Sequence, residues 1–466
     1  MTRRSRRVAI QGPQVALLTV VLAGAAALFF EGVAAASPVP FGSPVYETLE
    51  YLKTRGFLPL WAGAVRPVSQ RELASYLEEA RRRTTGLLLN PRDLAALDRL
   101  GRAVEAGGFV AVSGYGHMGL STVWAEWTSG IPRAGLSLGL QAWPTRANVR
   151  SAYVTFPIGT VDLWAGRIPV GWGASPDAGL VLSEYSGGLD QVQVSFEPFR
   201  WLRYAKLVGF LDGGRSVASM RADVQLGDLR LGFTEAVLMR GGPFWAYVVN
   251  PVPVSVGYEI NARLRSWRDN YMAGLEVEWR ARPGLRLYLD YVADDLTTPF
   301  PGFGPGRPPS RVGATFGIHV TEFVPGWDVR FQYTRVQNWT YADAGGLHWL
   351  HNGLPTGHPL GNDFDLWHLR ASMGDGPGSP DFWVSYLRKG EGRPDRFWSS
   401  LAEAESDFFL SGVVENSLIV GAEFGGRSGG WTYTVGPWLA YRWNAGHVPG
   451  ATRLDWGVSL AAQLRF

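Results

Sequence analysis

From Phe109 to the C-terminus, apolar and polar residues alternate with the two-residue period of a β-strand. Residues 454–466 show this most fully, because every second residue is apolar and the residues between are polar or small. Three further stretches repeat the pattern: 285–293, 312–320 and 327–333. Such stretches are about nine to eleven residues long, the length that a tilted strand needs to cross a bilayer. The pattern therefore predicts a series of membrane-length strands.

Alternation is also typical of a soluble β-sandwich, but other features of these strands favour a transmembrane barrel. Trp and Tyr gather near the strand ends on the apolar face, as interfacial girdles require. The opposite face carries charged residues, which suit a water-filled lumen. A sheet in lipid must also close, because an open edge would leave unpaired backbone groups in hydrocarbon. We expect an all-β transmembrane barrel of about 18 antiparallel strands over residues 108–466.

Loop lengths orient this barrel. Short connections alternate with long ones in the second half; the short ones are 282–284, 325–326, 374–380 and 425–430, and the long ones are 296–310, 338–363 and 390–414. Short turns face the periplasm and long loops the exterior. Phe466 then lies at the periplasmic side and resembles the terminal signal for the barrel-assembly machinery. Between Arg240 and Asn270 two prolines interrupt the pattern, which leaves open whether a strand lies there.

Residues 37–107 instead have the 3.6-residue period of helices. A first helix is expected from Ser43, as N-cap, to Gly56. A second begins with the capping box of Ser69 and Glu72, and a third follows before the strands. Three short helices bury little surface on their own. They predict a small periplasmic helical bundle packed against the barrel.

The first 36 residues are typical of a secretory signal peptide, with a basic start, an apolar stretch and a cleavage site after Ala36. Their removal leaves 40 basic and 40 acidic residues, so a nucleic-acid partner is not expected. The chain has no cysteine, which excludes thiol catalysis, disulfides and thiolate metal sites. Only 18% of its residues are charged and 13% are aromatic, which fits an outer-membrane location with lipid as a partner.

Four segments carry a resemblance to a known family. Residues 166–173 read GRIPVGWG, residues 180–189 read LVLSEYSGGL, and residues 351–363 read HNGLPTGHPLGND. With the helical stretch 46–80 before the strands, they resemble the capsule-assembly Wzi family. The resemblance implies an outer-membrane barrel with a periplasmic helical bundle, acting as a lectin that holds capsular polysaccharide at the cell surface.

The longest loop carries the chemistry of a carbohydrate site. Such sites stack flat aromatic rings on a sugar and use polar side chains for its hydroxyls. The candidates are Trp339, Tyr341, Asp343, His348, Trp349, His351, Asn352 and Asp363. Loop packing and the outer aromatic girdle are the alternative role for these rings. Trp172, between two glycines, is a further candidate that could fold into the barrel as a constriction or a sugar platform, and packing is the alternative role for its ring.

Charged residues on the inward face define a predicted lumen wall, which comprises Arg167, Arg286, Asp290 and Arg330. For Arg167 we expect an ion pair with Asp162 or Glu184. The seven histidines show no recognisable nucleophile context, and no phosphate-binding loop or metal-ligand motif stands out. The sequence therefore predicts neither an enzyme nor a cofactor.

Two function classes remain. The first is a surface polysaccharide-binding protein whose lumen is narrowed by inward side chains and the helical bundle. The second is a porin-like channel for small hydrophilic solutes, in which the lumen wall sets selectivity. The two differ in whether the barrel conducts.

Overall fold

The computed structural model describes residues 39–105, 108–117, 120–131, 134–143, 146–243, 245–249, 252–265, 269–295, 310–374, 379–406, 409–428 and 431–465. The predicted signal peptide, Phe466 and most of the loop at 296–310 lie outside the described residues.

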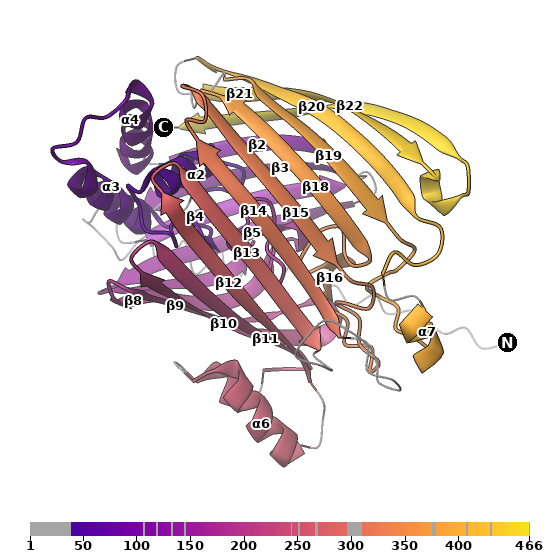
Figure 1. Cartoon of the computed structure of the whole chain (residues 1–466). Helices are drawn as coiled ribbons and strands as arrows, with labels where there is room; N and C mark the ends of the chain where they lie inside the picture. The colour runs from indigo at the N-terminus through magenta and orange to yellow at the C-terminus, as the bar shows by residue number, and fades with distance from the viewer. Residues whose placement is uncertain are drawn as a thin grey trace.

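Within the described residues, eighteen antiparallel strands close into a barrel (Figure 1). The first strand, β2, pairs with both β3 and the last strand, β22. The strands are β2 (Gly108–His117), β3 (Leu120–Ile131), β4 (Ala134–Trp143), β5 (Arg146–Ile158), β6 (Val161–Ile168), β8 (Leu189–Phe199), β9 (Leu202–Phe210), β10 (Arg215–Leu226), β11 (Leu229–Arg240), β12 (Asn270–Arg282), β13 (Leu285–Asp295), β14 (Arg311–Thr321), β15 (Trp327–Val336), β18 (Phe364–Met373), β19 (Asp381–Lys389), β20 (Glu415–Ser428), β21 (Trp431–Trp443) and β22 (Thr452–Arg465). The predicted fold class is confirmed.

The remaining elements are short. The helices are α2 (Val45–Arg55), α3 (Gln70–Thr84), α4 (Pro91–Glu105), α5 (Trp245–Val248), α6 (Val254–Arg265) and α7 (Leu401–Ser406). The two-residue strands are β1 (Val65–Arg66), β7 (Gly171–Trp172), β16 (Leu350–His351) and β17 (Leu354–Pro355), and the 3-10 turns are η1 (Glu184–Ser186), η2 (Asp212–Gly214) and η3 (Ala445–His447). None of the helices among the described residues is both long enough and apolar enough to span a bilayer.

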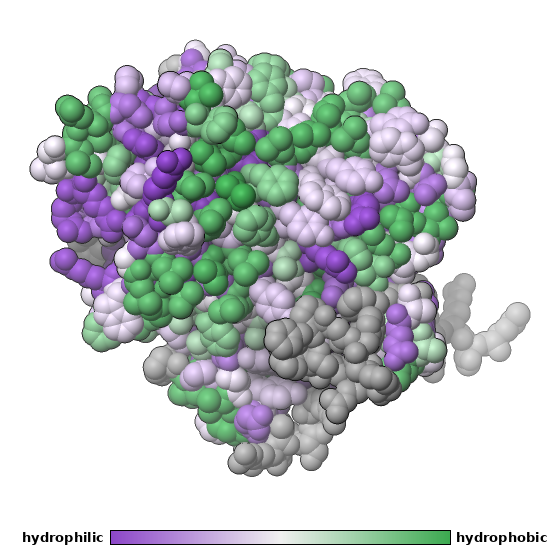
Figure 2. Space-filling model, in the orientation of Figure 1, coloured by the Kyte–Doolittle hydropathy of each residue, from purple (hydrophilic) through white to green (hydrophobic). Residues whose placement is uncertain are grey.

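The apolar face of the strands is the outer one. On β22, Leu454, Trp456, Val458 and Leu460 are all exposed, as the alternation predicts. Figure 2 shows hydrophobic residues across the outer surface of the strands, while hydrophilic residues gather over α3 and α4. Large apolar side chains exposed in such numbers belong against lipid.

Helices α2, α3 and α4 lie at the short-turn end of the barrel (Figure 1). Gly284, in one of the short turns, donates a hydrogen bond to the Thr54 carbonyl at the end of α2 (2.9 Å). The Ser69–Glu72 capping box forms as predicted. Pro44 already has helical φ and ψ at the start of α2, and the Ser43 hydroxyl accepts the Val45 N–H (3.4 Å), which is the capping contact expected of Ser43.

Helix α2 shares one hydrophobic core with α3 and α4, and it also enters the barrel. Nine of its eleven residues are buried, and its Thr54 hydroxyl lies 2.9 Å from His319 Nδ1 on β14. At the short-turn end, α3 and α4 extend beyond the barrel (Figure 1). The sequence left open whether a strand lies between β11 and β12. The helices α5 and α6 lie there, and no strand occurs in the described part of this segment.

Candidate functional site

Three segments enter the barrel and meet inside it. They are residues 39–69 with α2, residues 169–188 after β6 and residues 337–363 after β15, and we call them together the plug. The first and second join where Val65 of β1 pairs with Trp172 of β7. The second and third join where Ser183 donates its N–H to the Thr356 carbonyl (2.7 Å). The plug is therefore one connected body.

The motif glycines permit these close approaches. A Cβ at Gly357 would collide with the Leu180 carbonyl, and that carbonyl accepts the Tyr341 hydroxyl (2.7 Å). The segments 166–173, 180–189 and 351–363, which carry the family resemblance, all lie in the plug or at its edge. Several of their glycines, such as Gly171 and Gly357, leave no room for a side chain inside the barrel.

The predicted aromatic platform of the longest loop is inside the plug. Trp339, Tyr341 and Trp349 are buried, and Trp349 Nε1 donates to Asp294 of β13 (3.1 Å). The expectation that this loop presents them as a surface segment is wrong. A barrel of this width leaves an interior that loops can fill, and large rings gain most when they leave water.

Asp363 is an internal anchor. It is fully buried with φ 57°, and its carboxylate accepts bonds from Gly392 N (2.9 Å), Leu410 N (2.6 Å) and Ser411 Oγ (2.6 Å). These bonds hold the long loop 390–414 against the plug. Because its oxygens are already occupied, the predicted sugar contact by Asp363 is not possible in this arrangement.

Three polar candidates, His348, His351 and Asn352, are held by hydrogen bonds at the long-loop end of the barrel. The Asp212 carboxylate on η2 accepts from the Asn352 N–H (3.2 Å), and the Asp212 N–H donates to His351 Nδ1 (3.2 Å). Arg215 donates to the His348 carbonyl (2.8 Å). Burial alone would raise the pKa of Asp212, but the contact with His351 and the charge of Arg215 outweigh it and lower the pKa to about 2. Asp212 is therefore a carboxylate at neutral pH.

Asp343 makes hydrogen bonds with residues of its own loop. Its carboxylate accepts from Leu347 N (3.0 Å), and its N–H donates to His348 Nδ1 (3.1 Å). These bonds fix the conformation of the loop. The binding roles of Asp343 and His348 stay predictions.

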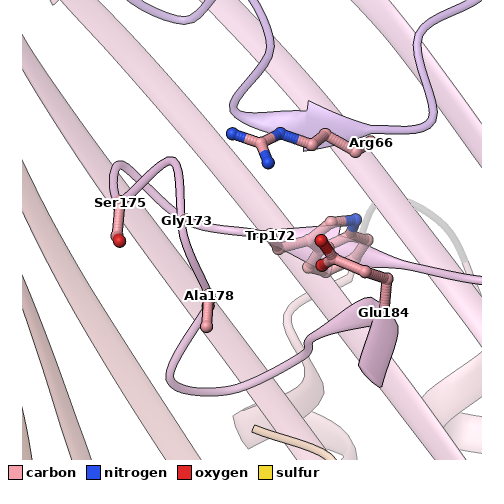
Figure 3. Close-up of a pocket in the computed structure, with 8 residues that line it drawn as sticks. Arg66, Trp172, Gly173, Ser175, Ala178 and Glu184 are labelled. Atoms are coloured by element: carbon pink, nitrogen blue, oxygen red, sulfur yellow. The ribbon is translucent and has the colours of Figure 1, made fainter. Parts of the chain in front are cut away.

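Trp172 folds into the barrel, as both a constriction and a sugar platform would require. It is buried and lines a small pocket together with Arg66, Gly171, Gly173, Ser175, Ala178, Gly179 and Glu184 (Figure 3). Burial raises the pKa of Glu184, although the nearby Arg66 charge opposes this shift. The pocket lies within the plug, so Trp172 is a packing residue and not an exposed sugar platform.

The side chains of the predicted lumen wall point into the barrel, but their partners there are protein groups. Arg286 donates to Glu278 (2.6 Å) and to Glu50 of α2. Asp290 accepts from the N–H groups of Ala174 (3.1 Å) and Ser175 (3.0 Å) in the plug. The expectation of a water-filled lumen is therefore wrong at these positions. The charges bind the plug because protein groups replace the water around them.

Two further wall arginines have definite partners. Arg330 of β15 donates to Glu47 of α2 (3.1 Å). Arg167 pairs with Asp190 at 2.6 Å, and not with Asp162 or Glu184 as predicted. The strand register explains this correction, because Arg167 on β6 lies directly opposite Asp190 on β8.

The surface above the plug was missed by the sequence analysis. We call Arg393, Asp395, Arg396, Phe397 and Trp398 the cap surface. The rings of Phe397 and Trp398 are half-buried with centroids 3.8 Å apart, while the other three residues are exposed. The available signal was the RPDRFW run within the loop 390–414.

The cap surface is supported from below. Trp339 of the plug meets Trp398 edge to face at 5.6 Å, and Arg311 of β14 lies over the Phe397 ring at 5.5 Å. Arg393 donates to Asp395 (2.9 Å). Within the part of the chain that the structure describes, no group of three His, Asp or Glu side chains is arranged to hold a metal ion.

Comparisons with known proteins address the fold. No protein-family model and no curated protein matches the chain. Among solved structures, Wzi from Escherichia coli matches with a TM-score of 0.67 at 14% identity, covering 93% of this chain and 100% of that chain. Wzi is described as an outer-membrane protein involved in group 1 capsule assembly and as a carbohydrate-binding β-barrel.

Two Pseudomonas aeruginosa proteins match more weakly. OccD3 (OpdP) has a TM-score of 0.44 at 11% identity over 78% of this chain and 91% of its own. OprD has a TM-score of 0.43 at 12% identity over 77% of this chain and 94% of its own. The chain therefore has the fold of a Wzi-like outer-membrane β-barrel.

Proposed function

We propose that this outer-membrane barrel belongs with the Wzi-type capsule-assembly proteins and binds capsular or another surface polysaccharide at its long-loop end. The observation that carries the proposal is the plug. Because three segments of the chain fill the interior, a long polymer meets the protein at the outer loops. The structural likeness to Wzi, a carbohydrate-binding barrel, supports the same role.

The cap surface has the chemistry for this role. Trp398 offers a partly exposed ring that a pyranose can stack on. Arg393, Arg396 and Asp395 surround it with donors and acceptors, and arginines suit the carboxylates of acidic sugars. Because Trp339 and Arg311 fix the rings from below, little side-chain entropy remains to be lost on binding.

The proposal extends to the path and partners of the protein. It includes secretion by the N-terminal signal peptide, insertion through recognition of Phe466 by the barrel-assembly machinery, and a periplasmic position for α3 and α4. The role is binding, so it involves no catalytic step and no cofactor.

Retention on immobilised capsular polysaccharide tests the proposal. Detergent-purified, folded protein should be retained, and Trp398→Ala should reduce retention. Trp456→Ala is the matched control, because Trp456 is exposed on the outer face of β22. Planar-bilayer recordings of the same preparation should show no large stable current. Large currents without retention would overturn the proposal in favour of a porin-like channel.

A further inference from the structure

The outer face of β11 is exposed over only half its length. Leu231 and Phe233, toward the short-turn end, are 38% and 41% exposed. Val237 and Met239 occupy the same face toward the long-loop end, yet they are 0% and 2% exposed. Strand alternation puts all four side chains outside the barrel. Part of the wall that should meet lipid is therefore covered by protein.

The cover is the segment that holds α5 and α6. Ala246 and Tyr247 of α5 and Val254 of α6 form one buried cluster with outward residues of β9, β10 and β11: Tyr204, Ala218, Met220, Val237 and Met239. Figure 1 shows α6 outside the barrel, beside β11. The segment leaves the end of β11 and turns back along the outer wall.

Two charged side chains lie on the outer face of the barrel beneath this segment. Lys206 of β9 and Glu235 of β11 both lie opposite Met220 of β10, so they share the outer face. Lys206 donates to the carbonyls of Val249 (2.6 Å) and Val252 (2.8 Å) after α5. Facing lipid directly, a lysine and a glutamate here would be costly.

The Glu235 carboxylate is satisfied within the same cluster. It accepts the Tyr271 hydroxyl (2.9 Å) and the Ser255 N–H of α6 (3.3 Å). The segment with α5 and α6 therefore supplies polar partners to Lys206 and Glu235. It covers the outer face of β11 on the long-loop side of Phe233.

The outer side of the cover is apolar. Trp245, Val248, Val249 and Val256 are between 42% and 60% exposed, and they continue the exposed apolar face of β11. We propose that α5 and α6 lie in the outer leaflet of the membrane and that these residues contact lipid acyl chains in place of the barrel wall. Continuity with the lipid-facing belt selects lipid as the occupant, since both surfaces meet the same medium.

The absence of native cysteine makes a direct test simple. Single variants Val256→Cys and Val248→Cys carry a nitroxide label in the full-length protein, reconstituted in bilayers. Accessibility to oxygen and to a water-soluble nickel complex is measured by electron paramagnetic resonance. Leu439→Cys on β21 gives the lipid-facing reference, and Val448→Cys beside η3 gives the water-facing reference at the long-loop end.

The proposal expects high oxygen and low nickel accessibility at both α5 and α6 labels, matching Leu439→Cys. Nickel accessibility matching Val448→Cys would overturn it, because the segment would then lie in water. Dipolar broadening between labels would also overturn it, because a second copy of the chain would occupy the surface. Heat-modifiable migration of each variant confirms that the barrel is folded before the comparison is made.

Discussion

Arg286 of the barrel wall and Glu50 of helix α2 form a buried ion pair. Arg286 also donates to Glu278 (2.6 Å), and Glu50 accepts from Lys53 of its own helix (2.9 Å). The pair connects two parts of the chain that are 236 residues apart in sequence. The N-terminal segment is thus fixed inside the barrel by charge as well as by packing.

Replacing Arg286 with alanine should strongly destabilise the folded barrel. Glu278 would remain buried with fewer partners, and breaking one side of a buried ion pair typically costs about 3–5 kcal/mol. Urea unfolding in detergent, followed by tryptophan fluorescence, measures the free energy. Arg427→Ala is the control, because Arg427 is exposed on β20. Equal stability of the two variants would show that α2 is held by packing alone.

Acid should weaken this attachment. Burial alone would raise the pKa of the Glu50 carboxyl, but the charges of Arg286 and Lys53 outweigh it and lower the pKa below 4.5. A lowered folded-state pKa gives stability that is complete above the ordinary value and is lost as the pH falls below it. The stability difference between wild type and Glu50→Gln should therefore be largest at neutral pH and shrink below pH 4.5.

The same unfolding measurement over a pH series tests this expectation. Glu105→Gln, at the exposed end of α4, should show no comparable pH-dependent difference from wild type. A difference between wild type and Glu50→Gln that grows on acidification would contradict the sign of the pKa shift.

Strand alternation was sufficient to predict the barrel, because one face of each strand meets a single medium. The outward residues of β22 and the strand total followed from this periodicity. Inward residues carry no such signal. Arg286 and Asp290 look the same in sequence whether they face water or a folded loop. The sequence therefore predicted a narrowed lumen as one alternative but not the entry of the long loop into it.

The candidate site was misplaced for a related reason. Trp339 and Trp398 both lie in polar, aromatic loop sequence, and composition does not show which ring supports the other. Their edge-to-face contact at 5.6 Å arises between loops that are distant in sequence. Only the fold shows that Trp339 is the buried support and that Trp398 remains partly exposed.

Deleting residues 338–362 and bridging the gap with a short glycine linker should raise ion conductance. This deletion removes the third plug segment, with β16 and β17, but leaves the eighteen described barrel strands, so the barrel should remain heat-modifiable. An eighteen-strand barrel has room for an aqueous path once its filling is reduced. Planar-bilayer recording measures the change. A silent but folded variant would show that the other two segments close the lumen by themselves.

Substituting Asp363 separates an anchoring role from a direct sugar contact. Asp363→Asn keeps a residue type that tolerates positive φ but loses the charge that holds Gly392, Leu410 and Ser411. We expect faster protease cleavage within the loop 390–414. Asp98→Asn, at an exposed position on α4, is the control. An intact loop together with lost polysaccharide retention would instead indicate that Asp363 contacts the sugar.

The ring at position 398 should matter through its flat face. Trp398→Phe keeps an aromatic plane over Trp339, whereas Trp398→Leu keeps apolar bulk without one. Since aromatic contacts contribute about 0.5–1.5 kcal/mol beyond burial, Trp398→Leu should weaken polysaccharide binding by up to about tenfold. Trp398→Phe should weaken it less. Affinity measured by surface plasmon resonance gives the order, and equal affinities for the two variants would place the sugar away from this ring.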